Sequence, residues 1–144
     1  MQVRHLSVVV VNQRSEIGRL SEAVDRFGEE HHLSADDIAA VNLALDEIVI
    51  NIIAHGYDDE REHQIHVSLA LEGEILTIQV EDDGKPFDPL EAPPPNLDLP
   101  IEDRPIGGLG IYIVRSTVNE IEHRREGGRN ILTMQKTMAG RAGQ

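Results

Sequence analysis

The segment from 34 to 55 limits the possible folds more than any other part of the chain. Ser34 followed by Asp37 resembles a capping box, the pairing of side chains that begins many helices. The apolar residues after it recur at helical spacing up to about His55, and they are Ile38, Val41, Leu45, Ile48, Val49 and Ile52. We therefore predict one long helix whose continuous apolar face must be covered by a sheet or by another helix.

The remaining segments predict a sheet and further helices. Residues 3–11 are rich in β-branched side chains and predict a strand, whereas 15–27 and 109–119 predict helices. Two hairpins are expected, 65–71 with 75–80 joined by Glu72-Gly73, and 121–125 with 130–136 joined at Gly127-Gly128. The expected fold class is α+β, a two-layer sandwich with helices on one face of a mostly antiparallel mixed sheet.

Length and charge exclude several classes of function. The chain has 144 residues, enough for one core, so 1–144 is expected to be a single domain. Asp and Glu number 26 against 13 Lys and Arg, a formal charge of −13, which argues against direct binding to nucleic acid or to an anionic membrane. There is no cysteine, no signal-peptide pattern and no long apolar run, so a cytoplasmic protein without disulfides is expected.

Residues 88–107 depart from ordinary globular composition. Five of the seven prolines lie between Pro89 and Pro100, so an extended or irregular path is expected there. A loop this long in a compact domain is often a lid or a binding segment. A surface excursion without such a role is an equally good interpretation.

Glu47, Asn51 and His55 form a polar stripe on the predicted helix 34–55. Their four-residue spacing advances about 40° per step, so all three lie on one side of the helix. A solvated helix face is the simpler interpretation. The alternative is a reactive site, because a carboxylate and a carboxamide one turn apart among isoleucines can hold a hydroxyl and a metal ion at adjacent points.

Asp82, Asp83 and Gly84 directly follow a predicted strand. They form either a tight turn or a place where a buried acceptor, Asp82, meets a ligand amine while Gly84 lets the backbone approach closely. Thr133 lies on the last predicted strand, where the pattern alone indicates only a hairpin. The seven histidines are scattered, and we interpret them as surface residues.

A glycine cluster, Gly107, Gly108 and Gly110, opens the predicted helix 109–119. Backbone amides at such a helix start bind phosphate well, and a flexible hinge is the alternative. The cluster is neither a P-loop nor a dinucleotide-binding fingerprint, because the residues required by those motifs are missing.

Taken in order, these clusters resemble the N, G1, G2 and G3 boxes of the Bergerat-fold (GHKL) ATPases. The segments "LALDEIVINIIAHGY", "VEDDGKPFDP" and "GGLGIYIVRSTVNEIEH" are most similar to the stand-alone anti-sigma factor serine-protein kinases of bacterial partner switching. The resemblance covers essentially the whole chain and implies a single histidine-kinase-like ATPase domain. One departure is Pro86, which replaces the second glycine of the family's Asp-x-Gly-x-Gly.

The resemblance implies a role for each matching residue. Glu47 would be the general base and Asn51 a ligand of Mg²⁺. Asp82 would accept from the adenine amino group, with Gly84 beside the ring and Thr133 supporting the adenine end. Gly108, Leu109 and Gly110 would bind the phosphates of ATP or ADP, and the ATP lid would span about 88–107. No role is assigned to His55.

The implied function is that of an ATP-dependent serine/threonine protein kinase and anti-sigma factor. It would phosphorylate a STAS-domain anti-anti-sigma protein, bind a sigma factor in the alternate state, and form a homodimer. The alternative is a nucleotide-gated interaction module of the same fold that transfers no phosphate.

Overall fold

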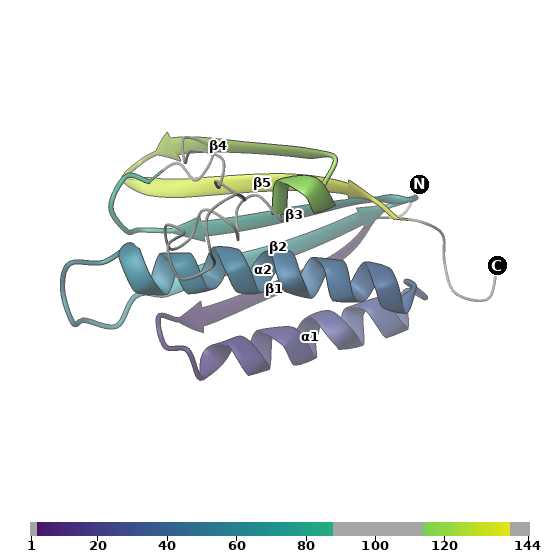
Figure 1. Ribbon diagram of the computed structural model, residues 1–144, viewed down its shortest axis with the longest axis horizontal. Coiled ribbons are helices and arrows are strands. Elements are labelled where there is room, and N and C mark those ends of the chain that lie inside the picture. Colours follow the sequence, from purple (N-terminus) through teal and green to yellow (C-terminus); the bar gives the residue numbers. More distant parts are fainter. Residues whose placement is uncertain (1–2, 88–113, 139–144) are drawn as a thin grey trace, which may run out of the picture.

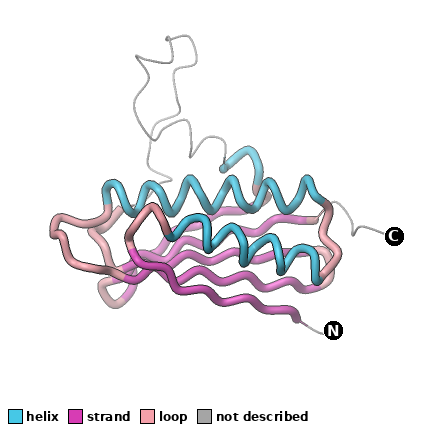
Figure 2. The backbone as a smooth tube through the Cα atoms, turned by 90° about the horizontal axis from the view of Figure 1, so that it is seen from below, coloured by secondary structure: helices cyan, strands magenta, loops and turns pink. Residues whose placement is uncertain are grey.

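The computed structural model describes residues 3–87 and 114–138, and these form a sheet covered on one face by helices. The chain begins with strand β1 (Val3–Val11), followed by helices α1 (Glu16–Glu30) and α2 (Ala35–His55). The hairpin β2 (Gln64–Glu72) and β3 (Ile75–Asp82) comes next, and a second hairpin, β4 (Glu120–Glu126) and β5 (Arg129–Thr137), ends the fold. Figure 2 shows both helices on the same side of the strands. The α+β two-layer prediction is confirmed.

The sheet order is β1-β2-β3-β5-β4, so β5 lies between β3 and its own hairpin partner (Figure 1). All four neighbouring pairs among the described strands are antiparallel, so the parallel pair that a mixed sheet would contain is not found in this part of the chain. The register places Asp82, at the end of β3, opposite Asn130, at the start of β5. Residues 48 positions apart in sequence therefore meet at one edge of the site described below.

The core is aliphatic and lies between the sheet and the helices. The apolar side chains that alternate along β2 and β3, such as Leu69 and Ile78, are at most 2% exposed because every second side chain of a strand points to the same face. They pack in one cluster with Leu45 of α2 and with Leu20 and Phe27 of α1. By length and hydropathy α2 could also cross a membrane, and its buried apolar residues belong to this cluster.

Local signals set the ends of the elements. Ser34 accepts a hydrogen bond from the Asp37 backbone N–H at 3.1 Å, which confirms the predicted cap of α2. The first hairpin turns at Gly73 and Glu74, one residue later than predicted, and Gly73 has a φ of 62° that favours glycine.

The helix predicted over 109–119 is shorter at its C-terminal end than the sequence indicated. Its described part is helical at 114–117, and the Asn119 N–H bonds instead to the carbonyl of Gln135 in β5. The backbone of Asn119 thus pairs with β5 instead of continuing the helix. The rest of that helix, the predicted lid 88–107 and Gly108, Leu109 and Gly110 lie outside the described residues.

Candidate functional site

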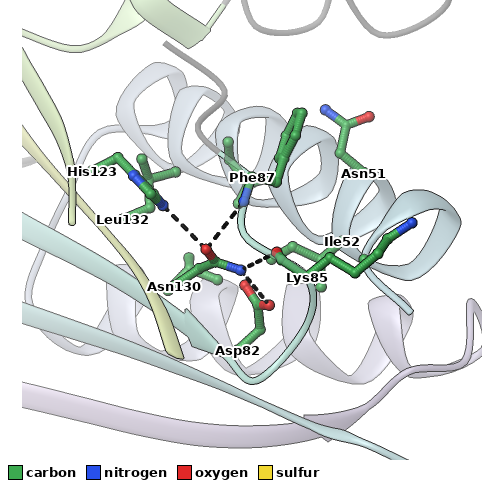
Figure 3. Close-up of a pocket in the computed structure, with 11 residues that line it drawn as sticks. Asn51, Ile52, Asp82, Lys85, Phe87, His123, Asn130 and Leu132 are labelled. Atoms are coloured by element: carbon green, nitrogen blue, oxygen red, sulfur yellow. Dashed lines mark hydrogen bonds between the residues drawn. The ribbon is translucent and has the colours of Figure 1, made fainter. Parts of the chain in front are cut away.

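A pocket opens where the C-terminal half of α2 faces the end of β3 and the start of β5 (Figure 3). The space between its walls is about 450 Å³, counted with the solvent at its mouth. Most of the wall surface is apolar, and five of the lining residues are polar or charged. The lining residues are Ile48, Asn51, Ile52, Gly56, Val80, Asp82, Lys85, Phe87, His123, Asn130 and Leu132.

Asp82 is the buried charged group of this pocket, only 4% exposed. Its Oδ1 accepts from the Gly84 backbone N–H at 2.8 Å and from Asn130 Nδ2 at 3.1 Å. Its Oδ2 has no hydrogen-bond partner among residues 3–87 and 114–138. A carboxylate oxygen left unpaired in an apolar pocket favours a ligand that brings a hydrogen-bond donor.

Asn130 is a site residue that the sequence analysis missed. It is 6% exposed, and its carboxamide bonds to Asp82, to the backbone of the 85–87 segment and to His123. The sequence pattern that could have identified it is its place in β5. Asn130, Leu132 and Met134 are every second residue of this strand, so their side chains share the face that points toward the helices. A buried Asn in such a row needs polar partners, which marks it as a site candidate.

Thr133 is not brought to this pocket, although the resemblance implied a role for it at the adenine end. Asn130 and Thr133 are an odd number of positions apart in a strand, so their side chains point to opposite faces. Thr133 lies in a shallow hollow on the uncovered face of the sheet with Glu122 and Gln135. Among the described residues of β5 it is Asn130, and not Thr133, that contacts Asp82.

The segment after Asp82 is held tightly against the end of α2. Lys85 donates from its backbone N–H to the Gly56 carbonyl at 2.8 Å, and Arg125 donates from Nη1 to the Gly84 carbonyl, also at 2.8 Å. A Cβ on Gly84 would lie 2.5 Å from the Gly56 carbonyl oxygen, so glycine is required for this approach. The close approach of Gly84 that the structure shows is to the protein's own backbone at Gly56.

The polar stripe of α2 is only partly in the pocket. Asn51 lines it, and Figure 3 shows its carboxamide at the mouth. Glu47, one turn earlier on the same side of the helix, is half-buried and does not line the pocket formed by the described residues, and His55 is exposed and does not line it either. The neighbouring Asp46 instead hydrogen-bonds to Ser21 of α1, and burial raises the pKa of its carboxyl.

His63 differs from the surface role that we assigned to the histidines. Its ring stacks on Tyr57 at a centroid distance of 4.1 Å, and its side chain is 16% exposed. Nε2 lies 2.8 Å from Asp59 and Nδ1 lies 3.2 Å from Asp83, and the hydrogen bond with Asp59 raises the pKa of His63. The Tyr57 hydroxyl is buried without a partner among the described residues, and burial raises its pKa.

No group of three or more His, Cys, Asp or Glu residues that could hold a metal appears in the described ranges. Within the described part of the chain, a metal ion at Asn51 would share its coordination with oxygens of a bound molecule or of water. Mg²⁺ is commonly held in that way, by one or two protein oxygens together with phosphate oxygens.

Comparison with known proteins assigns this chain to a family. The histidine kinase-like ATPase domain matches residues 11–136. The serine/threonine-protein kinase BtrW of Bordetella bronchiseptica is 28% identical over 94 residues, which cover 65% of this chain and 66% of BtrW. The serine-protein kinase RsbW of Bacillus cereus is 29% identical over 101 residues, 67% of this chain and 62% of RsbW. The matches thus span about two thirds of each relative's length.

Two solved structures share the fold. One contains the RsbU and RsbW domains of Rv1364c from Mycobacterium tuberculosis, with a TM-score of 0.70 at 18% identity over 96% of this chain and 33% of that one. The other is the histidine kinase AdeS of Acinetobacter baumannii, with a TM-score of 0.51 at 12% identity over 92% of this chain and 68% of that one. Since the family match covers most of the sequence, including α2, β3 and β5, the chain belongs to the histidine kinase-like ATPase domain family.

Proposed function

We propose that this protein is an ATP-dependent serine/threonine protein kinase and anti-sigma factor of bacterial partner switching. The observation that carries the proposal is the buried Asp82 carboxylate in an apolar pocket beside Asn51, in a chain of the histidine kinase-like ATPase family. The names of its curated relatives, serine-protein kinases, support the same reaction class.

The pocket fits the base of ATP. Adenine has an exocyclic amine that can donate to Asp82 Oδ2, and Ile52, Val80 and Leu132 offer aliphatic surface to the flat ring. Gly108, Leu109 and Gly110 would bind the phosphates through backbone amides, as the family resemblance implies. An apolar pocket around one acceptor favours a base with a donor over a base without one.

Asn51 at the mouth of the pocket is the residue that would hold Mg²⁺, with phosphate oxygens and water completing its shell. The donor set fits this ion because a carboxamide oxygen is a hard ligand. When bound, Mg²⁺ would neutralise phosphate charge, which matters for a chain with a formal charge of −13.

Glu47 is the proposed general base. It would take the proton from a serine or threonine hydroxyl as that oxygen attacks the γ-phosphorus, while the bond from the γ-phosphorus to the bridging oxygen breaks and ADP leaves. Since Glu47 lies one turn from Asn51 on α2, the base and the residue at the metal would share one rigid element.

The proposed protein substrate is a STAS-domain anti-anti-sigma protein, with a sigma factor bound in the alternate state. A homodimer in the cytoplasm completes the proposal, as implied by the family resemblance. Because the chain is strongly acidic, long-range electrostatic attraction would favour a partner that carries a basic surface patch.

A second candidate is a nucleotide-gated interaction module that binds ATP without transferring phosphate. The position of Glu47 favours it, because this side chain does not line the pocket formed by the described residues. In that case Asp82 and the pocket would still bind nucleotide, and the protein would select its partner by nucleotide state.

Phosphate transfer from γ-labelled Mg·ATP into a lysate of the source cells separates the two candidates. We compare the wild type with Glu47→Gln and with Asp46→Asn, a matched control whose carboxylate bonds to Ser21 on α1. A kinase labels a small protein with the wild type and with Asp46→Asn but not with Glu47→Gln. If nothing is labelled while ATP binds in a parallel titration, the interaction module is the correct function.

A further inference from the structure

His63 links the loop between α2 and β2 to the segment that follows β3. Its side chain is 16% exposed, and its ring stacks on Tyr57. Nε2 lies 2.8 Å from Asp59 Oδ1 in the loop, and Nδ1 lies 3.2 Å from Asp83 Oδ1 beyond β3. Each ring nitrogen therefore faces a carboxylate.

Two carboxylate contacts suit only one protonation state of the ring. A carboxylate only accepts hydrogen bonds, and a protonated imidazole carries a donor on each nitrogen, whereas a neutral one carries one donor and one lone pair. The neutral ring can thus donate to one of the two carboxylates, and it turns a lone pair toward the other. Since the contact with Asp59 is the shorter, Asp83 is the partner that is lost.

Asp83 has no other ion-pair partner among residues 3–87 and 114–138. Lys85, two residues later, pairs with Asp58 at 2.9 Å, and Arg129 of β5 pairs with Glu81 at 2.8 Å. The charge of Asp83 is therefore balanced by the histidine ring alone within this part of the chain, and only while that ring is protonated.

Two further groups that carry or can carry a charge lie around the ring. Tyr57 stacks on it, and burial raises the pKa of the Tyr57 hydroxyl, so this group stays neutral where histidine titrates. Arg61 bonds to Asp59 through its backbone N–H and acts on the same carboxyl through its charge, which does not change in this range. His63 is thus the group of this cluster that changes its charge near neutral pH.

Asp83 reaches the pocket only through its neighbours in the chain. Asp82 and Lys85 line the pocket, whereas Asp83 is 44% exposed and does not line it. Hydrogen bonds to the carbonyls of Gly56 and Gly84 also hold this segment, and neither involves the histidine ring. Loss of the Asp83 contact should therefore loosen this edge of the pocket without removing it.

We infer that His63 is a positioning residue of the pocket, and that its doubly protonated ring holds the segment 82–85 in the shape that binds nucleotide. As the pH rises and the ring becomes neutral, fewer molecules keep this shape, so the affinity for nucleotide falls. The hydrogen bond with Asp59 raises the pKa of His63, so the fall lies above the ordinary value of about 6.5. This role rests on the proposed nucleotide function.

Calorimetric titrations with Mg·ATP between about pH 6 and about pH 8.5 test this role. The proteins are the wild type, His63→Gln, Asp83→Asn and Asp59→Asn. His66→Gln is the matched control, because it removes an exposed histidine from the uncovered face of β2. The phosphates of ATP also titrate, so the dissociation constants are compared between proteins at the same pH, where that contribution cancels.

Asp59→Asn separates positioning from a purely structural role of the ring. The new carboxamide can donate to Nε2, so the neutral ring can keep its proton on Nδ1 and go on donating to Asp83. A ring that only packed in the loop would gain nothing from this change. We therefore expect Asp59→Asn to bind ATP about threefold more tightly than the wild type at about pH 8.5.

From about pH 6 to about pH 8.5, the wild type and His66→Gln should lose about threefold more affinity than His63→Gln and Asp83→Asn, the effect of one partly exposed ion pair. The inference is overturned if His63→Gln keeps the pH dependence of the wild type, or if Asp59→Asn binds no more tightly than the wild type at the higher pH.

Nuclear magnetic resonance of the nucleotide-free protein gives a readout that does not depend on the proposed function. The backbone amide signal of Gly84 should titrate together with the His63 ring in the wild type but not in Asp83→Asn. A Gly84 signal that ignores the ring would also overturn the inference. A wild type that binds no ATP at any pH refutes the proposed function instead, and the Gly84 signal then still decides whether His63 holds the segment.

Discussion

Replacing Gly84 by alanine tests whether the 84–87 segment depends on its close approach to α2. The added Cβ would lie 2.5 Å from the Gly56 carbonyl oxygen and 2.8 Å from Asp82 Oδ1. Real Cβ contacts stay beyond 3.0 Å, so the segment must move away by about 0.5 Å. Overpacking of this kind costs about 1–3 kcal/mol, and the hydrogen bond from Lys85 N–H to Gly56, now 2.8 Å long, contributes about 1 kcal/mol more.

We therefore expect Gly84→Ala to lower the free energy of unfolding by about 2–4 kcal/mol and the melting temperature by about 7–13 °C. Urea titration and thermal melts give both values. Gly18→Ala is the matched control, because Gly18 lies in α1 with nothing within 4 Å of an added Cβ, and it should stabilise by about 0.5–1 kcal/mol. If Gly84→Ala is as stable as the wild type, the steric argument is wrong.

Three further predictions concern the helix cap, the histidine pair and the core. Ser34→Ala should destabilise by about 1 kcal/mol in urea, while Ser15→Ala, which removes no side-chain cap bond, should be nearly neutral; equal losses would contradict the capping argument. Since the pKa of His63 is raised in the folded state, its pairing with Asp59 stabilises the fold. This stabilisation is fully present below the unfolded pKa of about 6.5, and it is lost as the pH rises through the folded-state pKa. The stability difference between the wild type and His63→Gln should thus shrink from pH 6 to about pH 8, and a constant difference would refute this pairing. Met134→Ala, at a fully buried position, should cost about 2–5 kcal/mol in the same titration, and a loss below about 1 kcal/mol would show that the core is looser than described.

Elements with a local signal could be predicted from the sequence. The strand over 3–11 has the predicted bounds, and α2 begins at its Ser34 cap and ends at His55 as expected. The helix predicted to Asn119 ended early because the backbone of that residue pairs with β5. The helix propensities of residues 109–119 cannot show that a later strand, β5, competes for the backbone hydrogen bond of Asn119.

The site could be predicted only where its residues are identified by their own motif. Asp82 and Asn51 belong to clusters that stand out in the sequence, and both line the pocket. Asn130 was missed because its contact with Asp82 depends on the register that places the two residues opposite each other. Thr133 was assigned by the family resemblance, and its strand position turns it to the other face. The environment of His63 was likewise missed, because one of its two ring contacts is with Asp83, which lies 20 positions later in the sequence.

The two edges of the sheet differ in their resistance to unwanted strand addition. β4 forms one edge, and five of its seven residues, in the sequence EIEHRRE, are charged. β1 forms the other edge, with the sequence VRHLSVVVV, in which Arg4 is the only Asp, Glu, Lys or Arg. Charged edges oppose intermolecular pairing, and uncharged β-branched edges promote it. The β1 edge is therefore more open to pairing with a strand of another molecule than the β4 edge, and Arg19 of α1, which donates to the Val9 carbonyl, is the charged side chain that guards it.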